Sequence, residues 1–128
     1  MPASERAVQL GLAAAQAAAD KLASDILLLD VSEQLVITDV FLLASAPNDR
    51  QVKAIVDDIE EQLRDLDAKP LRREGEKEGR WVLLDFGDLV VHVQHQEERV
   101  FYALERLWKD CPTIPFVDAD LTRAAGRH

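Results

Sequence analysis

The residues Trp81–Gln94, WVLLDFGDLVVHVQ, form the stretch from which the fold of this chain is predicted. Two runs of aliphatic and aromatic residues flank Gly87-Asp88, a pair suited to a two-residue turn with positive φ. If these two residues form the turn, Phe86 pairs with Leu89, and every other pair of the hairpin follows from that register. We therefore predict a β-hairpin with its turn at Gly87-Asp88.

Side chains alternate across a strand, so the predicted hairpin has two different faces. One face is wholly apolar and belongs in the core: Val82, Leu84, Phe86, Leu89, Val91 and Val93. The other face mixes large apolar and polar groups: Trp81, Leu83, Asp85, Val90, His92 and Gln94. A tryptophan beside aliphatic and hydrogen-bonding groups is typical of a protein-binding surface. A helix that covers this face is the alternative, and the pattern leaves both open.

The remaining chain supplies helices and further strands. Apolar residues recur at helical spacing in three segments, 4–22, 48–66 and 97–109. Apolar and β-branched blocks predict an antiparallel pair of strands, Asp25–Val31 and Leu35–Ser45, and a short edge strand, Leu71–Glu74. The expected fold is α/β (α+β), with a mixed sheet of about five strands flanked by helices. We expect one domain over residues 1–110 and a flexible tail over residues 111–128.

Composition narrows the class of partner. The 128 residues include 24 acidic and 15 basic side chains, a formal net charge of −9. Nucleic-acid binding depends on cations that neutralise phosphates, so we expect little direct nucleic-acid contact and favour a basic protein as partner. Cys111 is the only cysteine, which excludes an internal disulfide and fits the cytoplasm. No apolar run approaches the ~20 residues of a membrane span, so no membrane partner is expected.

The sequence offers little for catalysis, and we expect no cofactor and no metal. His92 and His95 are three residues apart in or near a strand, so they point to opposite faces. Cys111 has no histidine near it in the sequence, and no glycine-rich phosphate loop occurs. Three aspartates near strand ends, Asp39, Asp85 and Asp88, leave open a nucleotidyltransferase-like enzyme that binds nucleotides with a metal. A purely dimeric scaffold is a further alternative.

The segment from Gly79 to Trp108 resembles the ribosomal silencing factor family, also called Iojap-like. The residues that support the likeness are Trp81, Asp85, Gly87-Asp88, His92, Arg99, Tyr102, Leu104-Glu105 and Leu107-Trp108. Earlier residues also fit the family: Asp25, Leu29-Asp30-Val31, Thr38-Asp39 and Arg50-Gln51-Val52. The likeness spans about Ala7 to Trp108. Gln94 differs from the apolar methionine that is common in the family.

The resemblance implies a nucleotidyltransferase-like fold without catalytic residues. It implies binding to large-subunit ribosomal protein fourteen, which blocks joining of the small subunit and represses translation, especially when nutrients are limiting. A homodimer of the free protein is implied as well. Carried over residue by residue, the expected ribosomal contact consists of Trp81, Leu83, Asp85, His92 and Tyr102. Trp108 is expected in the core, because its spacing from Leu104 and Phe101 suits packing.

Overall fold

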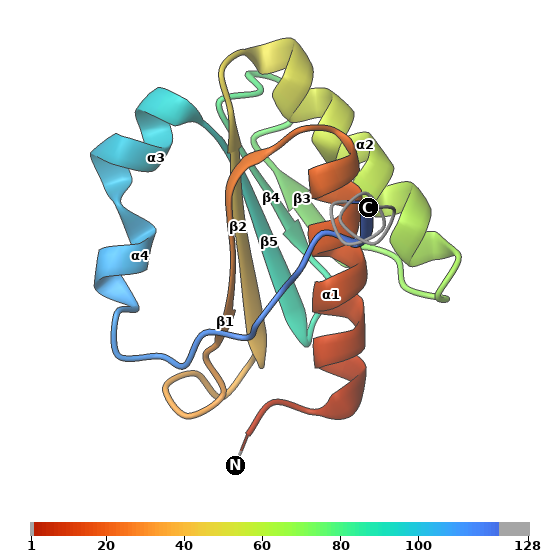
Figure 1. Cartoon of the computed structure of the whole chain (residues 1–128), viewed down its shortest axis with the longest axis vertical. Helices are drawn as coiled ribbons and strands as arrows, with labels where there is room; N and C mark the ends of the chain where they lie inside the picture. Colours follow the sequence, from red (N-terminus) through yellow and green to blue (C-terminus); the bar gives the residue numbers. More distant parts are fainter. Residues whose placement is uncertain (1, 121–128) are drawn as a thin grey trace, which may run out of the picture.

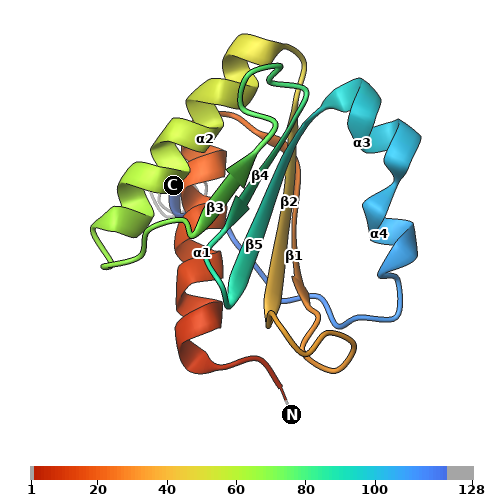
Figure 2. The ribbon, with the colours of Figure 1, turned by 180° about the vertical axis from the view of Figure 1, so that it is seen from behind.

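A computed structural model describes residues 2–120 of the chain. Five strands form one mixed sheet in the order β1-β2-β5-β4-β3. Helices α1 and α2 lie on one face of the sheet, and α3 and α4 lie on the other side (Figures 1 and 2). The elements are α1 Glu5–Asp20, β1 Ser24–Asp30, β2 Val40–Ala46, α2 Asp49–Arg64, β3 Arg72–Glu74, β4 Trp81–Asp85, β5 Leu89–His95, α3 Gln96–Tyr102 and α4 Leu104–Leu107.

The central hairpin has the predicted register. In the β4–β5 ladder Trp81 pairs with Gln94, and the amide N–H of Phe86 donates to the carbonyl oxygen of Leu89 at 2.8 Å. Gly87 has a φ of +88°, which is favourable for glycine because it has no Cβ. The predicted apolar face lies in the core, with Val82, Leu84, Leu89, Val91 and Val93 buried and Phe86 partly buried against them. The turn chemistry and the alternation together therefore determine this register.

The main core lies between the sheet and the helices α1 and α2. Strand β2 pairs antiparallel with β1 and parallel with β5, and α2 forms part of the connection between β2 and β5. Helix α1 lies close to the sheet because small residues line its buried side. A Cβ added at Gly11 would lie only 3.1 Å from Cδ2 of Leu28. Each long helix has a side-chain N-cap, Ser4 for α1 and Asn48 for α2, as helix ends require.

Strand β2 begins later than the sequence predicts, at Val40 instead of Leu35. Val40 pairs with Asp30, the last residue of β1, and with Leu89, the first residue of β5, so neither neighbouring strand extends beyond this point. The residues before Val40 have no ladder to join and form turns instead. Val36 and Ile37 are consequently exposed at 102% and 85%.

The predicted helix 97–109 is wrong as one continuous element. Ala103 has left-handed backbone angles, φ 45° and ψ 53°, and separates α3 from α4. The break lets Leu104 and Trp108 pack against a second, smaller core, which consists of Leu29, Val31, Phe41, Leu43 and Cys111. Trp108 therefore packs as expected. Val100 and Phe101, which share helical spacing with it in the sequence, are exposed at 79% each.

Residues 111–120 follow a defined path, which differs from the flexible tail expected for 111–128. Backbone hydrogen bonds join them to the outer edge of β1, from Asp30 N–H to Pro112 at 2.8 Å and from Ile114 N–H to Leu28 at 2.9 Å. Ile114 and Phe116 then pack against the main core. The expected tail beyond residue 120 lies outside the described residues. Within residues 2–120, no helix is both long and apolar enough to cross a membrane.

Candidate protein-docking site

A row of aromatic rings crosses the sheet face that α3 and α4 flank. We call it the aromatic row; it consists of Trp108, Phe41, His92, Trp81, Tyr102 and Phe101. Successive ring centroids lie 5.4, 5.2, 6.0, 4.7 and 4.9 Å apart along that order. The row is buried at Phe41 and His92 and reaches solvent at Tyr102 and Phe101, which are 48% and 79% exposed. It therefore joins the small core to the surface of α3.

His92 anchors the middle of the aromatic row. Its side chain is buried, and its Nδ1 accepts a hydrogen bond from Nε1 of Trp81 at 3.2 Å. Burial lowers the pKa of His92 to about 4, because a charged imidazole is poorly solvated there. The ring is therefore neutral at pH 7. The neutral ring can accept the indole hydrogen bond, and it thereby fixes the orientation of Trp81 on this surface.

Exposed apolar side chains continue from the aromatic row along α3 and α4. We call this surface the α3 patch; it consists of Val100, Phe101, Tyr102 and Leu107, all at least 48% exposed. Gln96, Glu97, Val100 and Phe101 line a shallow hollow on it. Large apolar groups gathered on one surface mark a site for a partner, whereas scattered ones do not. The rings of Trp81 and Tyr102, 4.7 Å apart, join the hairpin to this patch.

The structure brings together three of the five predicted site residues, Trp81, His92 and Tyr102. Leu83 pairs with His92 across the ladder and is half-buried beside this group. Asp85 lies at the far end of β4, where its Oδ1 accepts from the Gly87 N–H at 2.8 Å and thus supports the hairpin turn. Its other oxygen lies 3.9 Å from Nη2 of Arg72.

The mixed hairpin face is partly covered and partly open. Gln94 is fully buried, and its side-chain amide has no hydrogen-bond partner within residues 2–120. Trp81, Leu83, Asp85 and Val90 remain half-buried. Phe41, Phe101 and Trp108 belong to the aromatic row but not to the predicted site; the sequence indicated core packing for Trp108 and its spacing partner Phe101 and gave no signal for Phe41. The parallel pairing of Phe41 with Val90 could not be predicted, since no short turn sets the register between β2 and β5.

Arg99 links α3 to α4 beneath the patch. Its side chain is 7% exposed, and its Nε lies 3.2 Å from a carboxylate oxygen of Glu105. One guanidinium nitrogen, Nη1, has no hydrogen-bond partner within the described residues. The pair spans the break at Ala103, so it holds the two short helices in one arrangement.

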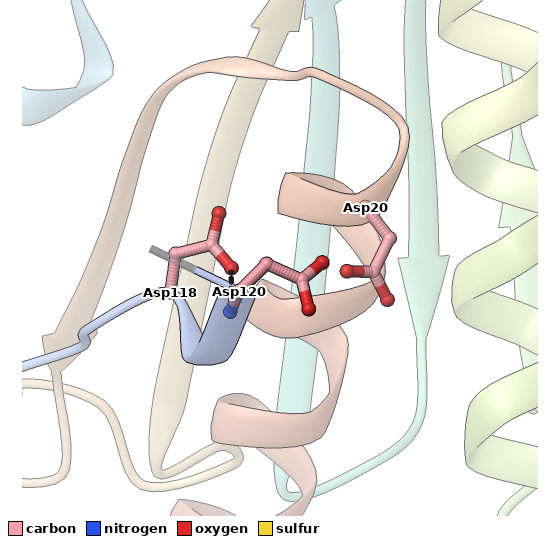
Figure 3. A group of neighbouring side chains, drawn as sticks. All are labelled: Asp20, Asp118 and Asp120. Atoms are coloured by element: carbon pink, nitrogen blue, oxygen red, sulfur yellow. Dashed lines mark hydrogen bonds between the residues drawn. The ribbon is translucent and has the colours of Figure 1, made fainter. Parts of the chain in front are cut away.

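Within residues 2–120, the three aspartates near strand ends, Asp39, Asp85 and Asp88, are not grouped at metal-ligand distance. One Asp39 oxygen accepts the Ser4 N–H at 2.9 Å, and Asp85 supports the turn. Within residues 2–120, one group of three carboxylates has its ligand atoms within 4.8 Å of one another: Asp20, Asp118 and Asp120 (Figure 3). The amide of Gln16 donates to Asp20 and to Asp118, at 2.9 Å each. We interpret this group as a link between α1 and residues 118–120, because nothing beyond the carboxylates points to an ion.

Comparison with known proteins agrees with the resemblance. The family model described as ribosomal silencing factor during starvation, RsfS, matches residues 4–128. The ribosomal silencing factor of Bacillus subtilis is 46% identical over 99 residues, which cover 77% of this chain and 84% of the relative. The mouse protein named mitochondrial assembly of ribosomal large subunit protein 1 is 30% identical over 89 residues, 67% of this chain and 39% of that protein.

A solved structure supports the same conclusion for the fold. The crystal structure of a protein from Chromobacterium violaceum has a TM-score of 0.77 and 32% identity to this chain. The match covers 80% of this chain and 85% of that one. Fold and sequence thus agree over most of the described residues, and the chain belongs to the RsfS family of ribosomal silencing factors.

Proposed function

We propose that this chain is a non-enzymatic factor that binds the large ribosomal subunit through ribosomal protein fourteen. Bound there, it blocks joining of the small subunit by steric occlusion and represses translation, especially under nutrient limitation. The observation that supports this proposal most directly is the aromatic row, which ends in the exposed rings of Tyr102 and Phe101 beside Val100. Aromatic anchors held by packing are the residues that supply most of the energy of protein interfaces.

Charge supports a basic protein as the partner. The net charge of −9 attracts a basic ribosomal protein and repels the phosphates that surround it. The mouse relative is named for assembly of the ribosomal large subunit, which supports the choice of subunit. We infer a cytoplasmic location, where bacterial ribosomes work. No bond needs to be made or broken, and no cofactor is required.

The test is co-sedimentation of the purified protein with large subunits, with Phe101→Ala as the site variant. Phe101 is 79% exposed, so its truncation leaves the core intact. Loss of an aromatic anchor costs about 2 kcal/mol, and binding should weaken about 30-fold. Val117→Ala is the matched control, because Val117 is 71% exposed and precedes the residues that lie against α1. Equal binding of the two variants would remove the α3 patch from the site.

Sedimentation of mixed ribosomal subunits with the same two proteins tests the mechanism. Added wild-type protein should lower the fraction of assembled ribosomes formed from mixed subunits, and Phe101→Ala should not. Binding without any effect on assembly would overturn steric occlusion while leaving the docking site in place.

We infer further that the free protein forms a homodimer through the α3 patch. Val100, Phe101 and Leu107 are at least 70% exposed in the single chain, and self-association would bury them. Dimer formation and ribosome binding would then compete for one surface. Sedimentation velocity should show a dimer for the wild type and a monomer for Phe101→Ala. A dimer of unchanged strength in this variant would contradict the shared surface.

A further inference from the structure

A basic hollow lies between the C-terminal half of α2 and the edge strand β3, two elements that lie side by side in Figure 2. We call it the basic notch. Ala68, Pro70 and Leu71 contribute small or apolar groups to its lining. Its charged lining residues are Glu60, Arg64, Lys69, Arg72, Arg73 and Glu76, four cations against two carboxylates. A local excess of positive charge is unusual on a chain whose net charge is −9.

The cations of the basic notch differ in how they are neutralised. Arg73 is held by Glu60 through two hydrogen bonds of 2.9 and 2.8 Å. Arg72 has only distant partners, 3.6 Å to Glu74 and 3.9 Å to Asp85. Arg64 and Lys69 are exposed and form no ion pair within residues 2–120. Three of the four cations are therefore available to an outside anion.

The helix dipole explains only part of this cluster. Arg64 lies in the last turn of α2, where a cation is favourable next to the terminal carbonyls. Lys69 lies beyond the helix end, and Arg72 lies on a strand. Backbone N–H groups already satisfy two of those carbonyls, since Ala68 donates to Leu63 at 2.9 Å and Asp67 to Arg64 at 3.0 Å. The helix end therefore does not account for Lys69 and Arg72.

The basic notch opens at the β3 edge of the sheet, and its α2 side lies on the face opposite the aromatic row (Figure 2). Arg72 pairs with Asp85 in the β3–β4 ladder, so their side chains lie on the same face. Asp85 and Trp81 point to the same face of β4, at its two ends, so Arg72 lies at the Asp85 end of the face that carries Trp81. A large body docked on the hairpin face would therefore extend over the outer strand β3.

We propose that the basic notch binds the phosphate backbone of RNA on the large ribosomal subunit, beside the protein that the aromatic row contacts. This inference rests on the proposed function. The arginine fork matches a phosphate group in geometry, and lysine adds a point charge. The attraction acts only over about 8 Å at physiological salt, so a few cations suffice locally although the chain as a whole is acidic. The notch thus refines the expectation of little nucleic-acid contact to one defined contact.

The test compares charge reversal inside the basic notch with charge reversal elsewhere on the same helix. The notch variant is Arg64→Glu with Lys69→Glu, two exposed positions. The control is Arg50→Glu with Lys53→Glu, also exposed, about 20 Å away near the start of α2 and equal in charge change. Affinity is measured for whole large subunits and for purified ribosomal protein fourteen, each at several salt concentrations.

We expect the notch variant to bind large subunits at least tenfold more weakly, with a salt dependence lowered by about 1.5 in log–log slope. Its affinity for the purified ribosomal protein should stay unchanged, and so should both affinities of the control. Arg64→Gln with Lys69→Gln should give an intermediate loss. An equal loss by control and notch variants, or a loss toward the purified protein, would overturn the proposal. Failure of the wild type to bind large subunits would instead overturn the proposed function.

Discussion

The indole Nε1 of Trp81 donates a hydrogen bond to Nδ1 of His92 at 3.2 Å. The two residues are not directly opposite in the ladder, where Trp81 faces Gln94, so the bond runs diagonally from β4 to β5. Because Nδ1 accepts, the single proton of the neutral imidazole lies on Nε2. A protonated imidazole has no free lone pair and could not accept this bond. The orientation of Trp81 therefore depends on the charge state of His92.

The first prediction concerns the stability of the protein at acid pH. Burial lowers the pKa of His92 from 6.5 to about 4. The unfolded chain therefore binds a proton at this residue at a higher pH than the folded chain does. The contribution to the free energy of unfolding is fully present above pH 6.5 and decreases by about 3 kcal/mol as the pH falls to 4. Denaturant unfolding between pH 7 and pH 4 measures it.

His92→Gln supplies the comparison for this experiment. The variant lacks the titrating group but keeps every other acid-sensitive residue of the chain. Its stability should therefore fall less steeply than that of the wild type between pH 6.5 and 4, while the two slopes agree above pH 7. Two parallel curves across the whole range would show that burial of His92 does not shift its protonation.

The second prediction concerns the link between α3 and α4. Glu105→Gln removes the negative charge that faces the buried guanidinium of Arg99, and an unpaired buried cation is strongly unfavourable. Glu105 is itself partly exposed, so we expect a loss of about 2 kcal/mol in the free energy of unfolding. Glu97→Gln is the control, since Glu97 pairs with Arg80 at a more exposed position. A loss no greater than that of the control would mean that the pair does not hold the two helices.

The third prediction concerns Ala103, whose φ of 45° places a Cβ in the left-handed region. Ala103→Val should destabilise the fold by about 1–2 kcal/mol, because a β-branched residue is especially strained there. Ala103→Gly relieves the strain but adds freedom to the unfolded chain, so it should stay within about 1 kcal/mol of the wild type. Thermal unfolding distinguishes the two variants. A valine variant as stable as the wild type would favour one continuous helix over residues 97–109.

The break at Ala103 also shows where prediction from the sequence reaches its limit. The hairpin register could be predicted because a Gly-Asp turn and strict alternation act over neighbouring residues. The exposure of Val100 and Phe101 could not be predicted, because the apolar spacing across 97–109 predicts a buried face only if the segment is one continuous helix. The break places Leu104 and Trp108 on the small core and leaves Val100 and Phe101 in solvent.

The residues of the docking site likewise fall into two groups, those that the sequence predicts and those that it does not. Trp81 and Leu83 were placed on one face by local alternation, and Tyr102 was supplied by the family resemblance. Phe41 joins them only through the parallel β2–β5 pairing. That pairing depends on how α2 and the β3–β4 segment pack, which acts over about fifty residues of chain. No short-range rule sets such a register.

The last prediction tests whether residues 111–120 contribute to the fold. Phe116 is half-buried against the main core, and Thr113 bridges to Leu29 on the otherwise open edge of β1. Phe116→Ala should therefore lower the free energy of unfolding by about 1–2 kcal/mol, less than for a fully buried phenylalanine. Val117→Ala, at an exposed position next to it, should change stability by less than about 0.5 kcal/mol. Equal and negligible effects in chemical denaturation would mean that this segment is not packed in solution, as expected for a flexible tail.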